Sequence, residues 1–352
     1  MKAKIFSKIL LSVSLMFVLG RAITSAQNDS PTSLQENAET PMPTATPNAT
    51  EVFATAHDGT CLQWDVYLPQ TVSATPRPVV LLVHIGAFRA GNRKDSGAVK
   101  AATTLRDAGF IACSIDYRLD APANFLPVPS ATCLPETGIC EAQTTPAFAE
   151  WIGESETQAS DVRKAIYAAR HPPSCSILST QSLNGKVGII GGSAGATHAL
   201  ACAASSHAEH NRPDAVVCLS GAYQFDDPES LADTTSVFRC AVMRYCNIVD
   251  LPNCDAGSTT DPRLTSGSPV YHVDQFCAPV YAFGSQQDSI TSDQLDDLQA
   301  RFTLVSLSPP HHQTQLIEGS KHAFAYWSDK INNRSNSYVY RLALDWLEDR
   351  LY

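Results

Sequence analysis

Short, continuous apolar runs alternate with longer stretches of helical spacing along most of this chain. Residues 78–84 are apolar at nearly every position, which is typical of a strand buried on both faces. Residues 52–56 and 62–68 flank Asp58-Gly59, which predicts two antiparallel strands joined by a turn. The pattern predicts strands at 52–56, 62–68, 78–84, 110–117, 186–190, 215–220, 278–284 and 314–317. It predicts helices at 98–108, 156–169, 291–302 and 337–350, and a small-residue helix that begins at 194.

Strands that alternate with helices after an antiparallel start predict an α/β fold. We expect a mostly parallel sheet of about eight strands, covered by helices on both faces. One domain should span residues 51–352. Two stretches within it, 120–150 and 226–268, lack this pattern, and we expect irregular insertions there that could form a lid. Because function collects at the carboxyl ends of parallel strands, each catalytic residue should directly follow an apolar strand.

The first 26 residues have the pattern of a secretory signal peptide. Basic residues precede a short apolar run at 9–20, and small residues follow, so cleavage is expected after Ala26. An uncleaved anchor is the alternative, although the run is too short for a comfortable membrane span. Residues 27–50 are rich in Ser, Thr, Pro and Asn, which predicts a disordered linker. The sequence therefore predicts a secreted protein, extracellular or periplasmic.

The composition excludes some classes of partner. Hydrophobic residues make up 44% of the 352 residues and charged residues 17%, which is typical of a globular protein with a substantial core. The formal net charge is −10, and removal of residues 1–26 takes away four basic residues and leaves −14. We therefore expect no nucleic-acid partner and no binding to anionic membranes. After signal cleavage, no remaining stretch is apolar and long enough to span a bilayer.

Eleven cysteines in an exported protein indicate disulfides, and the odd number leaves at least one free thiol. Cys113, Cys202 and Cys218 lie in apolar runs and are expected to be small buried residues. We expect most of the other eight, which lie in loop-like or edge segments, to be paired, with connectivity left open. Cys133 and Cys140, for example, would close a short loop. No Cys-x-x-Cys pair is present, so we expect no zinc site.

The stretch Gly191-Gly192-Ser193-Ala194-Gly195 lies between an apolar run of strand character and an Ala-rich run of helical character. Strand, tight turn and helix in this order predict a nucleophile elbow with Ser193 in a strained turn. The small neighbours would let strand and helix approach closely. Ser193 would then stand at a helix N-terminus, whose free N–H groups favour negative charge. A Gly/Ser turn without a catalytic role is the alternative.

A serine nucleophile needs a base and an acid that orients the base. His322 follows the expected strand at 314–317, and Asp288 follows the expected strand at 278–284. The order Ser193, Asp288, His322 is that of α/β-hydrolases and differs from the order in the other two common serine hydrolase folds. The remaining candidates, which strand-end position or chain order disfavours, are His84, His171, His198, His207, His210, His272, His311, His312, Asp226, Asp227, Asp293 and Asp296.

Donors for an oxyanion are expected in residues 84–88, His-Ile-Gly-Ala-Phe, at the end of the strand at 78–84. Small residues there let backbone N–H groups turn into the site. We expect donors from Gly86 and Ala87, joined by Ala194 after the nucleophile. A simple strand-to-loop glycine is the alternative.

These motifs resemble those of the carboxylesterase and hormone-sensitive-lipase-like group of α/β-hydrolases, above all its short secreted members without an N-terminal helical cap. Residues 84–88 resemble the group's His-Gly-Gly-Gly-type oxyanion motif, and 114–119 resemble its structural Asp-Tyr-Arg strand end. Ile85 departs from the motif, because the group has glycine there, and its branched side chain could narrow the acyl pocket or shift the loop. The resemblance covers residues 51–352.

The resemblance implies the α/β-hydrolase fold and carries Ser193, Asp288 and His322 over as a catalytic triad. Together with the residue patterns, it predicts a secreted serine esterase that acts on a small or polysaccharide-linked ester and needs no metal or organic cofactor. A secreted serine peptidase of the same fold and a non-catalytic hydrolase-fold binding protein are the alternatives.

Overall fold

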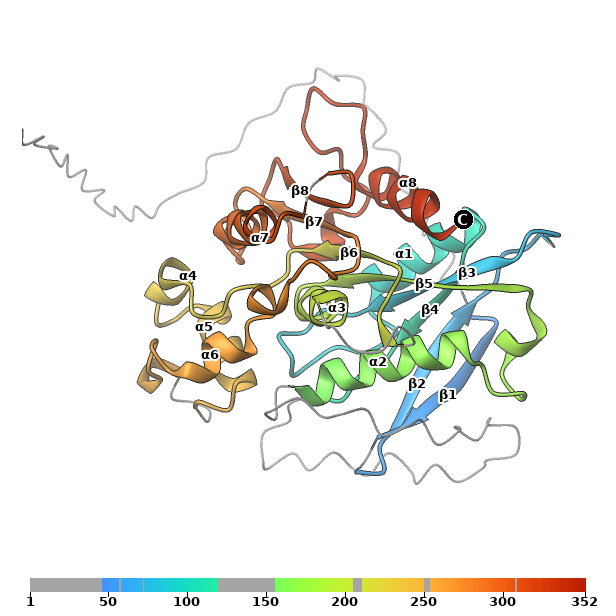
Figure 1. The fold of residues 1–352 in the computed structure, drawn as a ribbon, viewed down its shortest axis with the longest axis horizontal. Helices are drawn as coiled ribbons and strands as arrows, with labels where there is room; N and C mark the ends of the chain where they lie inside the picture. Colours follow the sequence, from blue (N-terminus) through green and yellow to red (C-terminus); the bar gives the residue numbers. More distant parts are fainter. Residues whose placement is uncertain are drawn as a thin grey trace, which may run out of the picture. The chain divides into compact units, whose positions relative to one another are not determined.

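A computed structural model of the protein describes residues 46–56, 58–71, 73–119, 156–204, 211–249, 254–307 and 309–352 (Figure 1). They belong to one compact unit that begins at Ala45. The expected signal peptide, most of the expected linker and the insertion at 120–150 lie outside the described residues. The first strand begins at Ala49, so the last two residues of the expected linker belong to the sheet.

An eight-stranded sheet has the strand order β1-β2-β4-β3-β5-β6-β7-β8. β2 pairs antiparallel with both β1 and β4, and all other pairs are parallel. The expected mostly parallel sheet is therefore confirmed. Its strands are β1 (Ala49–Thr55), β2 (Cys61–Tyr67), β3 (Arg77–Val83), β4 (Ile111–Ile115), β5 (Leu183–Gly192), β6 (Ala215–Leu219), β7 (Val280–Ser285) and β8 (His312–Ile317).

Strand β3 shows why its sequence is apolar throughout. Val79, Leu81 and Val83 pack into the core on one face of the sheet. Val80 and Leu82 pack into the core on the other face, because successive side chains of a strand point in opposite directions. All five side chains are buried, as expected for a central parallel strand.

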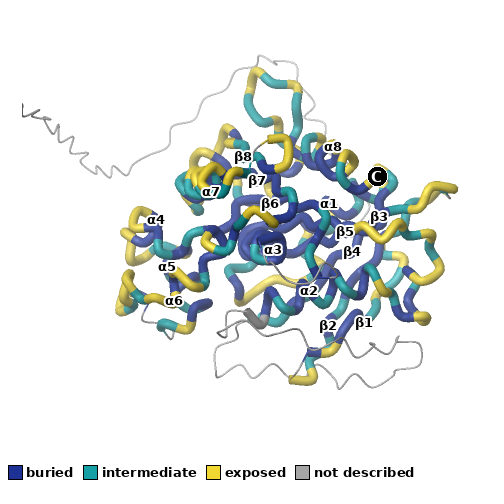
Figure 2. The backbone as a smooth tube through the Cα atoms, viewed as in Figure 1, coloured by how far each residue is buried: buried dark blue, intermediate teal, exposed yellow. Residues whose placement is uncertain are grey.

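Helices cover both faces of the sheet. α1 (Ser96–Asp107) and α8 (Val339–Leu351) pack on one face, while α2 (Glu156–Arg170), α3 (Ala194–Ala204) and α7 (Asp293–Leu304) pack on the other. Apart from α3, which begins at 194 as expected, the bounds lie within two residues of those predicted. Figure 2 shows α3 buried along its length, which its small alanines permit. No described helix is both long and apolar enough to cross a bilayer.

The stretch at 226–268 is helical where we expected irregular chain. It forms α4 (Pro228–Ala232), α5 (Val237–Tyr245), a 3₁₀ turn at Cys254–Ala256 and α6 (Pro262–Gly267). Figure 1 shows these helices grouped together between β6 and β7 in the chain. They pack around an apolar cluster of their own, which includes Phe225, Val242 and Leu264. We call the described residues from Pro228 to Gly267 the cap.

The cysteines divide into buried free thiols and disulfides. Cys246 and Cys277 are free and buried, although we expected most cysteines of their kind to be paired. Burial raises the pKa of the Cys246 thiol to about 12, which makes it inert. The remaining cysteines are the free and buried Cys113, Cys202 and Cys218, as expected, the pair Cys240–Cys254, the disulfide-bonded Cys61 and Cys175, and Cys133 and Cys140 outside the described residues.

Candidate active site

Ser193 lies in the tight turn between β5 and α3. Its φ of 52° falls in the left-handed region, which a non-glycine residue adopts at a cost. Its N–H donates to the Leu219 carbonyl at 2.8 Å, which ties the turn to β6. A Cβ on Gly191 would collide with the Gly195 carbonyl, and a Cβ on Gly195 would collide with the Val83 carbonyl. The flanking glycines are therefore required by space, and the turn has the predicted elbow geometry.

The predicted acid and base are in contact. Asp288 follows β7 and His322 follows β8, and parallel pairing brings these two strand ends together. His322 Nδ1 lies 2.7 Å from Asp288 Oδ1, at hydrogen-bond distance. The Asp288 side chain is 0% exposed and that of His322 is 30% exposed. A buried carboxylate thus orients an imidazole that is partly exposed.

Several contacts determine the ionisation of Asp288. Burial acts to raise the pKa of its carboxyl, but the hydrogen bond from His322 and the nearby Ser220 hydroxyl outweigh burial and hold the pKa below its usual value. Oδ1 also accepts from the Ile290 N–H at 3.2 Å and from the Ser289 hydroxyl at 3.1 Å. Asp288 is therefore ionised at neutral pH and able to stabilise a protonated imidazole.

Ser193 and His322 line one pocket of about 50 Å³. No hydrogen bond joins these two described residues in this structure. Such contacts often form only when substrate binds. The rest of the lining is largely apolar and includes Phe88, Ala194 and Ile290. The structure therefore brings all three predicted triad residues to one place, with the Ser193–His322 contact left to side-chain rotation.

Two of the expected oxyanion donors, Ala87 and Ala194, line this pocket, and Gly86 directly precedes Ala87. Gly86 has a φ of 143° and Ala87 a φ of 50°, and the Gly86 carbonyl accepts from the N–H groups of Arg89 and Ala90, which closes a tight turn. Among the described residues, the N–H groups of Gly86 and Ala87 donate to no partner. Ala194 is the first residue of α3, so its N–H has no partner within the helix. These three N–H groups are available to a negatively charged oxygen.

Comparison with known proteins identifies the fold. The family model BD-FAE, of α/β-hydrolase-like esterases, matches residues 64–130. Esterase 2 of Thermogutta terrifontis, phosphonylated by sarin, has a TM-score of 0.56 over 88% of this chain and 95% of its own, at 14% identity. The propionate-bound form of that esterase has a TM-score of 0.54 over 88% and 94%, at 16% identity.

This chain has the α/β-hydrolase fold. Its structural neighbours named above are esterases. Among curated proteins, the non-reducing polyketide synthase mapC' of Penicillium brevicompactum is 44% identical over 64 residues, which cover 18% of this chain and 3% of the synthase. The synthase pkbA of Emericella nidulans is 44% identical over 62 residues, covering 18% and 2%. The chain thus spans only about 3% of the length of these relatives.

In this α/β-hydrolase, Ile85 lies away from the pocket. Its side chain packs against the core cluster that contains α1 and α8. A Cβ on Gly192 would lie 2.9 Å from Ile85 Cγ2 and 2.7 Å from the Phe324 ring. Ile85 therefore packs against Gly192 and is not among the residues that line the pocket.

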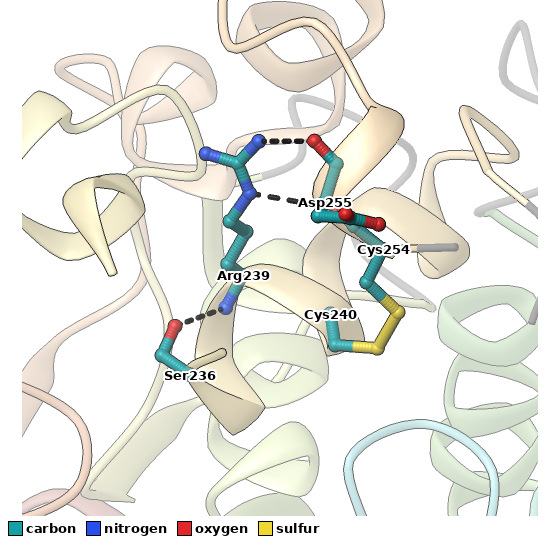
Figure 3. Close-up of a disulfide and its surroundings, with 5 residues drawn as sticks. All are labelled: Ser236, Arg239, Cys240, Cys254 and Asp255. Carbon is teal, nitrogen blue, oxygen red and sulfur yellow. Dashed lines mark hydrogen bonds between the residues drawn. A yellow bond between two sulfur atoms is a disulfide. The ribbon is translucent and has the colours of Figure 1, made fainter. Parts of the chain in front are cut away.

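The cap supplies one wall of the pocket through Val237, Phe238, Ala241 and Val242 of α5. Val237 is 66% exposed and stands at the rim. The Cys240–Cys254 disulfide ties α5 to the 3₁₀ turn that follows it, as Figure 3 shows.

The cap is also held by the buried Arg239, seen beside the disulfide in Figure 3. Its guanidinium donates to the carbonyls of Leu231 at 2.8 Å, Gly257 at 3.0 Å and Asp255 at 3.3 Å. One side chain therefore joins α4, α5 and the 3₁₀ turn, and the wall of the pocket is rigidly supported.

Sequence reasoning missed Ser220, which directly follows β6 and has a φ of 52°. The Ser220 and Tyr326 hydroxyls are hydrogen-bonded at 2.9 Å, and the Tyr326 hydroxyl lies 3.2 Å from the Phe283 carbonyl. Ser220 Oγ in turn accepts from the Ala323 N–H at 3.1 Å. Ser220 therefore anchors the loop immediately after His322. A serine followed by glycine at a strand end was the only signal.

Two of the competing candidates, His207 and His210, lie outside the described residues. None of the others lines the pocket. His84 is buried, stacks on Tyr117 with ring centroids 4.2 Å apart, and donates from Nδ1 to the Ile85 carbonyl at 2.7 Å. Asp226 accepts from Thr265 in the cap, and the other acids lie outside the pocket. No group of three or more acidic, histidine or cysteine side chains in the described part of the chain is placed to bind a metal.

Proposed function

We propose that this α/β-hydrolase is a secreted serine esterase that cleaves carboxylic esters through an acyl-enzyme on Ser193. Ser193 Oγ attacks the ester carbonyl carbon while His322 Nε2 takes the hydroxyl proton. Asp288 holds Nδ1–H and stabilises the imidazolium that forms. The N–H groups of Gly86, Ala87 and Ala194 bind the oxyanion.

The intermediate then collapses, and the C–O bond to the leaving alcohol breaks as His322 returns the proton to the alcohol oxygen. Water enters, gives its proton to His322, and attacks the acyl carbon. A second collapse releases the carboxylic acid and restores the Ser193 hydroxyl. Each proton is returned, so the cycle needs no cofactor.

The hydrogen bond between Asp288 and His322, beside the pocket that Ser193 lines, is the observation that carries this proposal. Structures of the Thermogutta esterase phosphonylated by sarin or bound to propionate and butyrate lend support, since those ligands are covalent hydrolase inhibitors and short carboxylic acids. The pocket is small, about 50 Å³, and its lining is largely apolar. It favours short, uncharged acyl groups.

Turnover of p-nitrophenyl esters tests the assignment. Ser193→Ala and His322→Ala should each lower kcat by at least about 10³-fold, because each removes a proton-transfer partner. His311→Ala, at an exposed loop histidine, is the matched control and should keep wild-type turnover. Wild-type activity in either triad variant would overturn the proposal.

Substrate panels separate the remaining alternatives. We expect acetate and butyrate esters to be cleaved faster than octanoate, and p-nitroanilides to be cleaved poorly, whereas a peptidase would cleave the anilides. A fluorophosphonate probe should label Ser193, and its failure would favour a binding protein. Export is tested by N-terminal sequencing of the protein recovered outside the cytosol, which should begin at Gln27.

A further inference from the structure

The oxyanion loop has a conformation that needs support from its surroundings. Ala87 and Phe88 have φ angles of 50° and 67°, in the region that side chains rarely adopt. Two such residues in succession persist only where neighbouring groups hold them. We propose that Gln158 of α2 and His198 of α3 form a clamp that holds this loop in its oxyanion-binding conformation. This inference rests on the proposed function, and both residues act by positioning the loop.

The hydrogen bonds of the clamp fix the orientation of each group. Gln158 Nε2 donates to the Phe88 carbonyl at 2.8 Å, and Gln158 Oε1 lies 2.9 Å from His198 Nε2. Because the Phe88 carbonyl can only accept, the amide must point its nitrogen there and its oxygen at His198. His198 must therefore carry its proton on Nε2.

His198 makes no other hydrogen bond among the described residues. The side chain is 0% exposed, and Nδ1 is buried without a hydrogen-bond partner. Burial, aided by the charges of His84 and Arg163, lowers the pKa of His198 to about 3. The ring is thus neutral wherever the enzyme would work, and it donates one hydrogen bond, to Gln158.

The side chain of Phe88 is held as firmly as its backbone. Its ring stacks on Tyr245 of the cap with centroids 4.1 Å apart and meets the edge of His198 at 5.5 Å. Phe88 also lines the pocket, next to Ala87. Loss of the clamp would free the loop to relax toward negative φ and turn the Ala87 N–H away from the oxyanion.

Steady-state kinetics on a short p-nitrophenyl ester tests the clamp. Gln158→Met, which cannot donate to the Phe88 carbonyl, should lower kcat about tenfold to a hundredfold with KM within about threefold, because the oxyanion is stabilised only in the transition state. His198→Gln keeps an N–H donor, whereas His198→Phe keeps the aromatic shape alone. The clamp predicts a higher kcat for the glutamine variant, and a packing role predicts the reverse order.

His312→Phe is the matched control. His312 is also buried, lies at hydrogen-bond distance from a carbonyl through Nε2 and leaves Nδ1 unpartnered. It is the first residue of β8, at the end of the strand opposite to the one that His322 follows. The kcat of the His312→Phe variant should stay near that of the wild type. An unchanged kcat in Gln158→Met, or an equal loss in His312→Phe, would overturn the clamp.

A second measurement needs neither a folded variant of the clamp nor turnover. Of the three buried rings, selective ¹⁵N-histidine labelling of the wild-type protein should show His198 and His312 protonated on Nε2 and His84 protonated on Nδ1 at neutral pH. The His84 and His312 signals are assigned by their loss from His84→Phe and His312→Phe. Protonation of His198 on Nδ1 would refute the clamp. Absence of esterase turnover in the wild type would instead refute the proposed function, and the result on the His198 tautomer would still stand.

Discussion

Replacement of Asp288 by asparagine separates the charge of the acid from its geometry. Three groups donate to Oδ1, namely His322 Nδ1–H, the Ile290 N–H and the Ser289 hydroxyl. Oδ2 is buried and accepts no hydrogen bond within the described residues. The asparagine should therefore place its carbonyl oxygen where Oδ1 stands, because the Ile290 N–H can only donate, and its NH₂ group where Oδ2 stands. His322 would keep its tautomer and lose only the charge that faces it.

The expected loss is the difference between a charged and a neutral hydrogen bond to the imidazolium. Bonds to charged groups contribute ~1.5–3 kcal/mol and neutral bonds ~1 kcal/mol, so the transition state should lose about 0.5–2 kcal/mol. Since each ~1.4 kcal/mol is a factor of ten, kcat should fall about 2- to 30-fold. An inverted amide would donate to Nδ1, force the ring proton onto Nε2 and abolish the base, at a cost of ~10⁴-fold.

Steady-state turnover of p-nitrophenyl butyrate at pH 8 decides between these outcomes. Asp288→Ala, which also removes the orienting hydrogen bond, should lose more activity than Asp288→Asn. Asp345→Asn, at an exposed acid of α8, should behave as wild type. A loss near 10⁴-fold in Asp288→Asn would refute the argument from the donors around Oδ1. No loss at all would remove Asp288 from the mechanism.

Three further predictions concern the cap and its neighbourhood. Burial, with repulsion from Asp227 and neighbouring acids, raises the pKa of Asp297 to about 6, so folding stability should fall as pH rises from about 4 to 6. After a discount for solvent exposure, Asp297→Asn should raise the free energy of unfolding in urea by about 1 kcal/mol at pH 7 and leave it unchanged at pH 4. An equal increase at both pH values would contradict this prediction. The double variant Cys240→Ser, Cys254→Ser removes a disulfide between residues 14 positions apart, which stabilises the fold by ~3 kcal/mol. The variant should show faster hydrogen exchange in α5 and a higher KM. The control variant Cys246→Ser should not raise KM. Phe238→Ala should shift acyl preference toward octanoate relative to wild type, and an unchanged chain-length profile would place the acyl group elsewhere.

The sheet and the strand-end residues could be predicted because both follow from local pattern. Continuous apolar runs mark strands that are buried on two faces, and parallel pairing then brings the ends of β7 and β8 to one edge. Asp288 and His322 were found by this rule without any knowledge of strand order. The order itself, with β4 and β5 on either side of β3, leaves no local signal.

Two of the three cap helices were missed because they are too short to show helical periodicity. α4 has 5 residues and α6 has 6 residues, less than two turns each. Each begins with the same signal, an aspartate that caps the helix and a proline directly after it, at Asp227-Pro228 and Asp261-Pro262. That signal was available in the sequence and outweighs weak periodicity in so short an element.

Residues that act through others were missed for a different reason. His198 was set aside because it lies inside the helix after the elbow, yet it contacts the loop through Gln158, which lies 40 positions away in the chain. Pairings of this kind depend on how α2 packs against α3, and spacing carries no information about that packing. The pairing of individual cysteines was left open for the same reason: four of the six described loop cysteines are disulfide-bonded, as expected of most, and Cys246 and Cys277 are free and buried.

Backbone strain independently marks the same site. Of the seven described non-glycine residues with positive φ, five belong to it: Ala87, Phe88, Ser193, Ser220 and Ala323. They come from the ends of β3, β5 and β6 and from the loop after β8. These positions are far apart in the sequence and meet only in the folded protein. Such conformations cost about 1–3 kcal/mol each and persist where surrounding contacts hold them. Here those contacts are the Leu219 carbonyl for Ser193, Tyr326 for Ser220 and Gln158 for Phe88. Substitution of a residue that supports a strained position should therefore lower kcat before it lowers folding stability.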